Sequence, residues 1–306
     1  MKYYTIAGKK VSAVIQGCMR FGRIEQSRVD SVIKTALECG INFFDNADIY
    51  TNGLCEEKLG KFLADNPGVR DNIIIQTKCG IKKNPSSYDF SKKHILSSVD
   101  GSLMRMGIDH IDFLLLHRPD ALCDPEEVAE AFDILYRSGK VGHFGVSNHN
   151  PMQIELLSKY LGKNRIVFNQ LQFSLTNSTI IDCGLNVNMT NDAAINRDDS
   201  VLDYCRLNDI TIQPWSPFQF GFFGGVFIGN PDFPELNSTL DRISEKYGIT
   251  PTGLAIAWIL RHPAKMQPII GTMTPSRIKE ICNACDVTIT HDEWYDLYRS
   301  AGNKLP

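Results

Sequence analysis

The chain has 306 residues, enough for one large domain or two of ordinary size. Its 32 basic and 35 acidic residues leave a net charge of -3, which argues against nucleic acid or an anionic membrane as a partner. With 43% hydrophobic and 22% charged residues, the composition is typical of a globular protein with a sizeable core. No apolar run approaches the length of a membrane helix, and Lys9 and Lys10 lie where a signal peptide would be apolar. We therefore expect a cytoplasmic protein with a small-molecule partner.

The nine cysteines are odd in number and scattered, unlike the dense, even set of a secreted disulfide framework. We interpret them as reduced thiols. Cys282 and Cys285 have the spacing of half a zinc site, but His291 is the one further candidate ligand nearby. We therefore predict no metal and place both cysteines in a helix.

Short apolar runs alternate with segments of helical periodicity along the chain. Eight runs are predicted as strands, several of them continuously apolar, as expected when both faces of a sheet are covered. They are Ala13–Gly17, Ile41–Asp45, Asn72–Lys78, Ile111–His117, Val141–Asn148, Arg165–Phe173, Ile210–Ser216 and Met266–Thr272. The alternation indicates parallel strands joined by helices, and eight repeats match the size of a closed (β/α)8 barrel. We predict one α/β domain over residues 1–306, a (β/α)8 TIM barrel.

Local signals support this barrel and add elements at its ends. Asn150-Pro151 places a capping side chain and a first-turn proline before a helix. Tyr3–Val14 is predicted as an N-terminal β-hairpin on the barrel floor, and Thr290–Ala301 as an extra C-terminal helix. The alternative, a doubly wound open sheet, would require a glycine-rich fingerprint that Gly17–Gly22 lacks.

Two stretches interrupt the alternation. Asn186–Ser200 is polar and is expected to form a surface loop. Phe218–Phe233 is rich in glycine and aromatic residues and is expected to lie over a planar ligand. Substrate specificity should come from the loops at the barrel mouth, which are Phe21–Glu25, Asn52–Leu54, Lys82–Phe90, Arg118–Cys123 and these two stretches.

Polar residues stand at the carboxyl ends of the predicted strands, where the active sites of such barrels lie. They are Asp45, Lys78, His117, Ser147, Asn148, Gln170, Ser216 and Thr272, with Tyr50 five residues beyond Asp45. Barrel closure would bring a carboxylate, an amine, an imidazole and a phenol to one mouth. A charged lysine beside a tyrosine lowers the pKa of the phenol, so we expect Tyr50 to donate a proton to a carbonyl oxygen. Because no side chain supplies hydride, a nicotinamide cofactor is required.

A candidate phosphate site follows the eighth strand. Thr274-Pro275-Ser276-Arg277 combines a cap, a first-turn proline and a basic residue at the start of a helix. Phosphate sites often follow the seventh and eighth strands of a barrel, although this signal is weak in isolation.

Several of these segments resemble the aldo-keto reductases in order and spacing. They are Asp45-Asn46-Ala47-Asp48-Ile49-Tyr50, Thr77-Lys78-Cys79-Gly80, Leu114-Leu115-Leu116-His117-Arg118-Pro119-Asp120 and Gly139-Lys140-Val141 with Phe144-Gly145-Val146-Ser147-Asn148. The resemblance implies a catalytic tetrad of Asp45, Tyr50, Lys78 and His117, with Tyr50 as general acid. It also implies an extended NADPH held without a Rossmann domain.

The resemblance also implies a set of cofactor contacts. Ser147, Asn148 and Gln170 would face the carboxamide, Trp215 would stack on the nicotinamide ring, and Ser216, Pro217 and Phe218 would line the pyrophosphate. Gly271, Arg277 and Glu280 would lie around the adenosine, and Cys18, Met19 and Asp45 would also touch the cofactor. Gly271 and Ile281 depart from the lysine and asparagine that many members have, and this weakens recognition of the 2′-phosphate and adenine. Arg277 could still clamp that phosphate, so we expect NADPH, with NADH as the alternative.

The leading hypothesis is therefore an NADPH-dependent reductase of aldehydes or ketones. A nicotinamide-binding regulatory or sensor protein is the second hypothesis, because some similar barrels are channel subunits. The third is a Schiff-base aldolase that uses Lys78. Pairing with Asp45 would keep Lys78 protonated and poorly nucleophilic, which argues against the aldolase.

Overall fold

The computed structural model describes residues 1–83 and 86–306, and its centre is a ring of eight parallel strands. In chain order these strands are β3 (Ile15–Gly17), β4 (Phe43–Asp45), β5 (Ile74–Cys79), β8 (Ile111–Leu116), β9 (Val141–Ser147), β10 (Ile166–Gln172), β11 (Thr211–Trp215) and β14 (Ile269–Ile270). They are hydrogen-bonded in the order β11-β10-β9-β8-β5-β4-β3-β14. Between the two outer strands, the Gln267 N–H donates to the Ile212 carbonyl at 3.0 Å, which nearly closes the ring. The predicted (β/α)8 barrel is confirmed.

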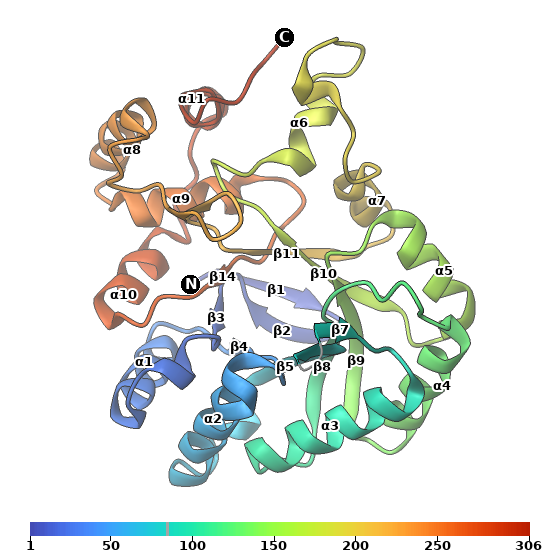
Figure 1. Ribbon diagram of the computed structural model, residues 1–306. Helices are drawn as coiled ribbons and strands as arrows, with labels where there is room; N and C mark the ends of the chain where they lie inside the picture. Colours follow the sequence, from blue (N-terminus) through green and yellow to red (C-terminus); the bar gives the residue numbers. More distant parts are fainter. Residues whose placement is uncertain (84–85) are drawn as a thin grey trace.

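Helices surround the strands on all sides (Figure 1). They are α1 (Gln26–Glu38), α2 (Leu54–Asp65), α3 (Lys92–Met106), α4 (Pro125–Arg137), α5 (Pro151–Leu161), α6 (Thr179–Leu185), α7 (Val201–Leu207), α8 (Pro234–Tyr247), α9 (Pro251–Arg261), α10 (Pro275–Ala284) and α11 (His291–Ser300). Their starts follow local chemistry, since Asn150 and Thr290 complete capping boxes at α5 and α11. Within the described part of the chain, no helix is both long and apolar enough to cross a membrane.

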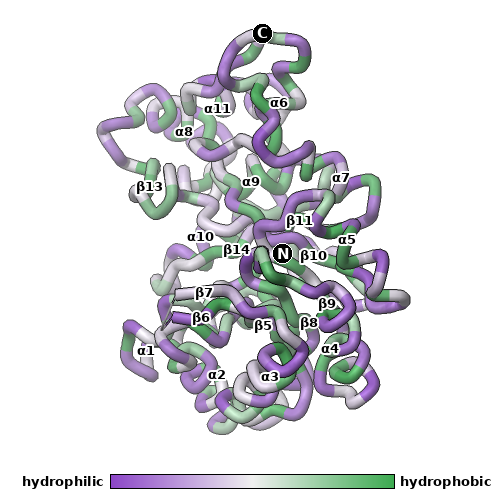
Figure 2. The backbone as a smooth tube through the Cα atoms, turned by 45° about the vertical axis from the view of Figure 1, so that its right-hand side comes forward, coloured by the Kyte–Doolittle hydropathy of each residue, from purple (hydrophilic) through white to green (hydrophobic). Residues whose placement is uncertain are grey.

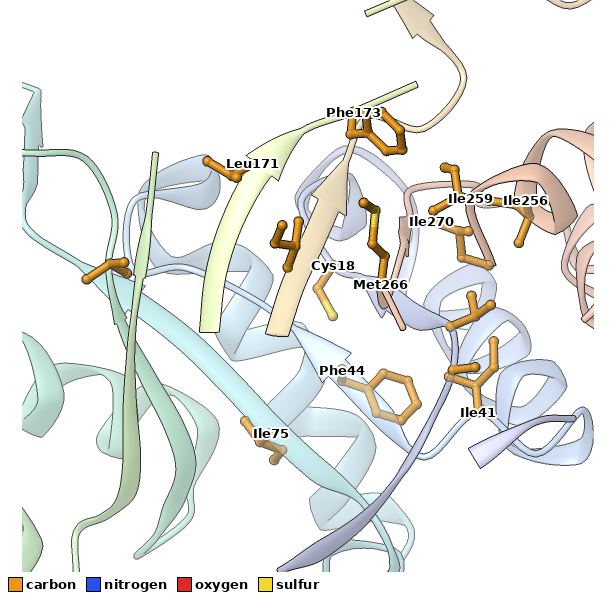
Figure 3. Close-up of a cluster of buried hydrophobic side chains, with 14 of the residues drawn as sticks. Cys18, Ile41, Phe44, Ile75, Leu171, Phe173, Ile256, Ile259, Met266 and Ile270 are labelled. Atoms are coloured by element: carbon orange, nitrogen blue, oxygen red, sulfur yellow. The ribbon is translucent and has the colours of Figure 1, made fainter. Parts of the chain in front are cut away.

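The hydrophobic core forms two layers. The outer layer fills the space between the strands and the helices, and Figure 2 shows hydrophobic residues concentrated along β5, β8 and β9. Figure 3 shows part of this layer, where Ile256 and Ile259 of α9 lie near Ile270 of β14. The inner layer lies inside the barrel and consists of Val11, Ile15, Phe43, Ile74, Phe113, Leu115, Phe168 and Ile269. Strand residues alternate between the two layers, as strand geometry requires.

The N-terminal hairpin covers the floor of the barrel. Its strands are β1 (Tyr3–Ile6) and β2 (Lys9–Ser12), which pair antiparallel. Val11 of β2 belongs to the inner core layer, and Lys9 forms an ion pair of 2.8 Å with Asp112 near the start of β8. The hairpin therefore seals the amino ends of the strands and leaves the opposite end as the mouth.

The structure adds elements that the sequence pattern did not predict. Two small hairpins occur in mouth loops, β6 (Ile81–Lys83) with β7 (Ser86–Tyr88) and β12 (Gln219–Phe220) with β13 (Gly225–Val226). The first lies in the predicted specificity loop 82–90, of which residues 84–85 lie outside the described residues. Helices α6, α7 and α8 were also missed, and α6 and α7 flank the predicted loop 186–200.

The last helix, and the helix that carries Cys282, lie where they were predicted. α11 packs outside the barrel, where the Trp294 ring stacks on Trp258 of α9 with ring centroids 4.9 Å apart. Cys282 and Cys285 lie at the C-terminal end of α10 and are unbridged, as are the other seven cysteines. Among the described residues, no group of three or more histidine, cysteine or acidic side chains could hold a metal ion.

Candidate active site

An ion pair and a phenol meet at the mouth of the barrel. Parallel pairing sets Asp45 opposite Gln76, two residues before Lys78 on the same face of β5. The ammonium group of Lys78 donates to Asp45 Oδ2 at 2.7 Å and to the Asn46 carbonyl at 2.8 Å. It also donates to the Tyr50 hydroxyl at 3.2 Å, in the short helical segment that follows β4. One amine therefore connects a carboxylate with a phenol.

Burial and neighbouring charges together set the pKa values of Lys78 and Tyr50. Burial by itself lowers the pKa of Lys78, but the charge of Asp45 and the contact with Tyr50 more than offset it, so the pKa lies above its usual value. For Tyr50 burial is the largest influence and raises the pKa, while the charge of Lys78 lowers it less. Lys78 lowers the phenol pKa as predicted, but the predicted net fall of this pKa is wrong, because desolvation of the phenolate outweighs the attraction of the ammonium group. Tyr50 therefore rests protonated.

His117 follows β8 and stands beside Tyr50. The two rings meet edge to face with centroids 5.8 Å apart. Burial, followed by the charges of Lys78 and Arg118, holds the pKa of His117 well below its ordinary value, so its imidazole is neutral. Its Nδ1 atom is buried and has no hydrogen-bond partner among the described residues. A neutral imidazole with one nitrogen protonated can donate a hydrogen bond to a substrate oxygen.

Buried amides complete the surroundings of Asp45. Gln76 and Gln170 each donate to Asp45 Oδ1 at 2.7 Å. Both also donate to Gln213 Oε1, at 2.9 and 3.0 Å. Gln213 in turn donates to Gln267 Oε1 at 3.1 Å, and Gln267 donates to the Ser12 carbonyl at 2.7 Å. A continuous path of amides therefore runs from the carboxylate to the barrel floor.

A cavity of about 640 Å³ opens above the cluster, a volume typical of sites for small molecules and cofactors. The predicted site residues that line it are Met19, Asp45, Tyr50, His117, Ser147, Asn148, Gln170, Trp215, Ser216, Pro217, Phe218, Gly271 and Arg277. Lys78 lies beneath it and reaches it through Asp45 and Tyr50. Cys18 is fully buried and Glu280 is not among the lining residues, because α10 reaches the cavity only through its first turn at Arg277. The cofactor contacts of Cys18 and Glu280 stay predictions.

The side of the cavity near β9 and β11 carries a chain of amide and hydroxyl groups. Trp215 Nε1 donates to Asn148 Oδ1 at 3.2 Å, and Asn148 Nδ2 donates to Ser147 Oγ at 2.8 Å. Asn148 and Ser216 both adopt positive φ angles, 60° and 53°, which non-glycine residues rarely do. Such backbone strain is typical of functional sites. The Phe223 ring stacks near the indole of Trp215 with centroids 6.1 Å apart.

The other end of the cavity is positively charged. Arg20 donates to the Gly271 carbonyl at 3.0 Å, and Arg277 lies in the first turn of α10. A Cβ added to Gly271 would meet no atom within 4 Å, so the backbone there is open to the cavity. Two guanidinium groups beside a helix N-terminus suit a phosphate-bearing ligand. The donor set therefore fits a nicotinamide dinucleotide.

Three sets of residues at this site were not identified from the sequence. Gln170 was named but Gln76 and Gln213 were not, although a glutamine inside an apolar strand is a visible signal. Arg118 was placed in a specificity loop without being identified as a cavity residue. The positions of Phe222 and Phe223 depend on the hairpin β12–β13, for which the sequence carries no clear signal.

Comparison with known proteins agrees with this geometry. The family model "Aldo/keto reductase family" matches residues 13–300. A 6-dehydroglucose reductase of Agrobacterium fabrum is 37% identical, with 96% of each chain covered. The uncharacterized oxidoreductase YcsN of Bacillus subtilis is 36% identical, also with 96% of each chain covered. The aldo-keto reductase yakc [NADP(+)] of Schizosaccharomyces pombe is 26% identical over 92% of this chain and 90% of its own. The chain therefore belongs to the Aldo/keto reductase family of NAD(P)H-dependent oxidoreductases.

Proposed function

We propose that this protein reduces an aldehyde or ketone to an alcohol with NADPH, and that Tyr50 is the general acid. The observation that carries the proposal is the Lys78 ammonium group, which bonds both Asp45 and the Tyr50 hydroxyl at the cavity wall. When bound, the nicotinamide supplies hydride to the carbonyl carbon. The side chains must supply the proton that the carbonyl oxygen needs.

The tetrad residues have separable roles in this proposal. Tyr50 holds the proton to be transferred, and Lys78 stabilises the phenolate that remains after transfer. Asp45 keeps Lys78 charged, because burial alone would lower its pKa. His117, held neutral by burial, donates a hydrogen bond that positions the carbonyl oxygen. A protonated Lys78 is a poor nucleophile, so the aldolase alternative is disfavoured.

The cofactor is assigned to residues along the cavity. Asn148, Ser147 and Gln170 offer amide and hydroxyl groups for a carboxamide, and Trp215 offers a ring for stacking. Arg277 would pair with the 2′-phosphate that distinguishes NADPH from NADH. Replacing Arg277→Gln should lower affinity for NADPH about 10-fold or more and leave NADH affinity within about twofold, measured by fluorescence titration. Equal losses for both cofactors would contradict this assignment.

The proposal is tested by the variant Tyr50→Phe. Loss of the general acid should lower the rate of carbonyl-dependent NADPH oxidation, followed by absorbance, by about 10²-fold or more. NADPH binding, measured by fluorescence, should persist because the ring remains. Tyr136→Phe, at an exposed tyrosine on α4, is the matched control and should keep full activity. Unchanged turnover in Tyr50→Phe would refute the proposal.

A further inference from the structure

Arg118 occupies an unusual place in the cavity. It directly follows His117 at the end of β8, is partly buried, and lines the cavity with the tetrad. Its guanidinium carbon lies 5.9 Å from the centroid of the Trp215 ring. These contacts place it at the tetrad side of the cavity, whereas Arg20 and Arg277 stand at the Gly271 end.

This guanidinium group has no counter-ion in the described structure. Asp45, the acidic residue of the cavity lining, is already bonded to Lys78. The other tetrad groups, His117, Lys78 and Tyr50, provide no negative charge to Arg118, because burial raises the pKa of the Tyr50 phenol and keeps it protonated. Asp198 lines an adjoining groove together with Arg118 and Arg197, but both of its carboxyl oxygens are buried and have no hydrogen-bond partner among the described residues. Burial lowers the pKa of Arg118, and Tyr88 alone opposes this.

An unpaired, partly buried guanidinium group is costly unless an anion joins it. Its planar fork matches the two oxygens of a carboxylate, sulfonate or phosphate, and such charge-assisted bonds are strong in a partly dry site. The walls beside it are apolar, formed by Ile81, Trp215 and Phe222. A ligand that suits this region carries an oxyanion at one point and an apolar or weakly polar body.

We propose that Arg118 is the specificity-determining residue of this reductase and binds an oxyanion group of the substrate, so that the preferred substrates are anionic aldehydes or ketones. The proposal rests on the carbonyl reduction proposed above. Arg118 then acts on substrate selection, and its loss should affect charged and neutral substrates differently. Loss of a tetrad residue would lower turnover of both.

The test compares two rigid aldehydes that differ in charge, 4-formylbenzoate and its neutral methyl ester. The measured quantity is the ratio of their kcat/KM values with NADPH, so that the intrinsic reactivity of each aldehyde cancels between variants. Arg118→Met should lower the ratio about 30-fold or more, and Arg118→Lys should retain an intermediate preference for the anion. NADPH titration of each variant confirms that it is folded. A ratio for Arg118→Met within twofold of the unmodified enzyme would overturn the proposal.

Two control variants show whether the loss of anion preference is specific to Arg118. Arg165→Met removes an exposed arginine just before β10, at the floor end of the barrel, and should leave the ratio unchanged. Asp198→Asn should also leave the ratio unchanged. A ratio that rises or falls in this variant would show that Asp198 is the counter-ion of Arg118, and this would overturn the proposal. Assays with 4-formylbenzenesulfonate and 4-formylphenyl phosphate in place of 4-formylbenzoate identify which oxyanion is preferred. If Arg118→Met loses the preference for each anionic aldehyde over the neutral ester, the three oxyanions share one subsite.

A binding experiment keeps this proposal distinct from the proposed function. Terephthalate, which has no reducible carbonyl, is titrated into the enzyme with saturating NADP+ and its affinity measured by calorimetry. Terephthalate binding that weakens about 10-fold or more in Arg118→Met supports the anion subsite, even if neither aldehyde is reduced. Failure to reduce either aldehyde would refute the proposed carbonyl reduction and leave the subsite supported. Equal terephthalate affinity in both proteins would overturn the subsite whatever the turnover.

Discussion

Gln213 connects the Asp45 carboxylate to the barrel floor through buried amides, and its removal tests how much this path stabilises the fold. The side chain is fully buried. Its Oε1 accepts from Gln76 and Gln170, and its Nε2 donates to Gln267. The substitution Gln213→Leu keeps most of the volume and removes all three hydrogen bonds.

The size of the effect follows from those three bonds. Each buried polar atom left without a partner costs about 1–3 kcal/mol. Gln76 and Gln170 keep their bonds to Asp45, so the penalty of about 1–3 kcal/mol for an unpaired atom falls on Gln267 Oε1. The lost bonds of Gln76 and Gln170 to Gln213 add about 1 kcal/mol each, which gives a total loss of about 3–5 kcal/mol. Unfolding entropy of about 2.1 cal/mol/K per residue gives about 0.6 kcal/mol/K for a chain of this length. The Tm should therefore fall by about 5–8 °C.

The assay is thermal unfolding followed by circular dichroism, with urea unfolding as a second measurement. The double variant Gln213→Leu with Gln267→Leu is the informative comparison, because it removes both partners of one bond. Replacing both partners by apolar groups leaves fewer unpaired atoms, so the double variant should be less destabilised than the sum of the two single variants. A Tm change below about 2 °C for Gln213→Leu, or strictly additive losses, would refute the reasoning.

Three further predictions concern packing, protonation and the cofactor. A Cβ at Gly60 of α2 would lie 2.6 Å from the Met106 carbonyl oxygen, so Gly60→Ala should lower the free energy of unfolding by about 1–3 kcal/mol. A Cβ at Gly184 of α6 would meet nothing within 4 Å, so Gly184→Ala should be neutral or stabilising. Urea unfolding midpoints measure both effects. Burial, followed by the charge of Glu56, raises the pKa of Asp48 from its usual 3.8 to about 7, so the folded state binds the proton more tightly than the unfolded state and stability falls as pH rises from about 4 to about 7. Asp48→Asn should therefore stabilise the protein more at about pH 8 than at about pH 4, by at most about 4 kcal/mol, and an equal effect at both pH values would contradict this. Gly271→Lys should increase NADPH affinity more than NADH affinity in a fluorescence titration, because the position is open to the cavity beside Arg277; equal gains would argue against a 2′-phosphate there.

The barrel was predictable because its signals are local. Each strand is a compact apolar run, and helices such as α5 begin at a cap followed by proline. Predicted strand ends differed by a few residues, as in Ile41–Asp45 against the observed Phe43–Asp45. The helix α8 was missed although Leu236, Leu240 and Ile243 recur at helical spacing. The hairpins β6–β7 and β12–β13 could not be predicted, because pairs of two- and three-residue strands depend on the surfaces on which they lie.

The candidate site was predictable in its residue types and less so in its energetics. Polar residues at strand ends are visible in the sequence, and barrel closure brings them together. The direction of the Tyr50 pKa shift was not visible, because it depends on how fully the phenol is removed from water and on its 3.2 Å contact with Lys78. The sequence also could not predict that Arg118 lacks a counter-ion among the described residues, because an acidic residue from any loop at the mouth could have paired with it.

The interior of the barrel explains why an ion pair can lie so deep. Along inward-facing positions, Phe43 precedes Asp45 and Phe168 precedes Gln170, each by two residues. Two residues along each strand, the inward-facing side chains therefore change from aromatic rings to polar groups. Asp45 Oδ1 would have no solvation if it rested directly on the rings, and the cost of an unpaired buried charge is several kcal/mol. The glutamines replace the missing water with fixed donors, so Asp45 Oδ1 is hydrogen-bonded while Oδ2 holds Lys78 against Tyr50. A slip of one residue in the pairing of β4 with β5 would turn Lys78 to the outer face of the barrel and separate it from Asp45 and Tyr50. The geometry of the site therefore depends on the strand register.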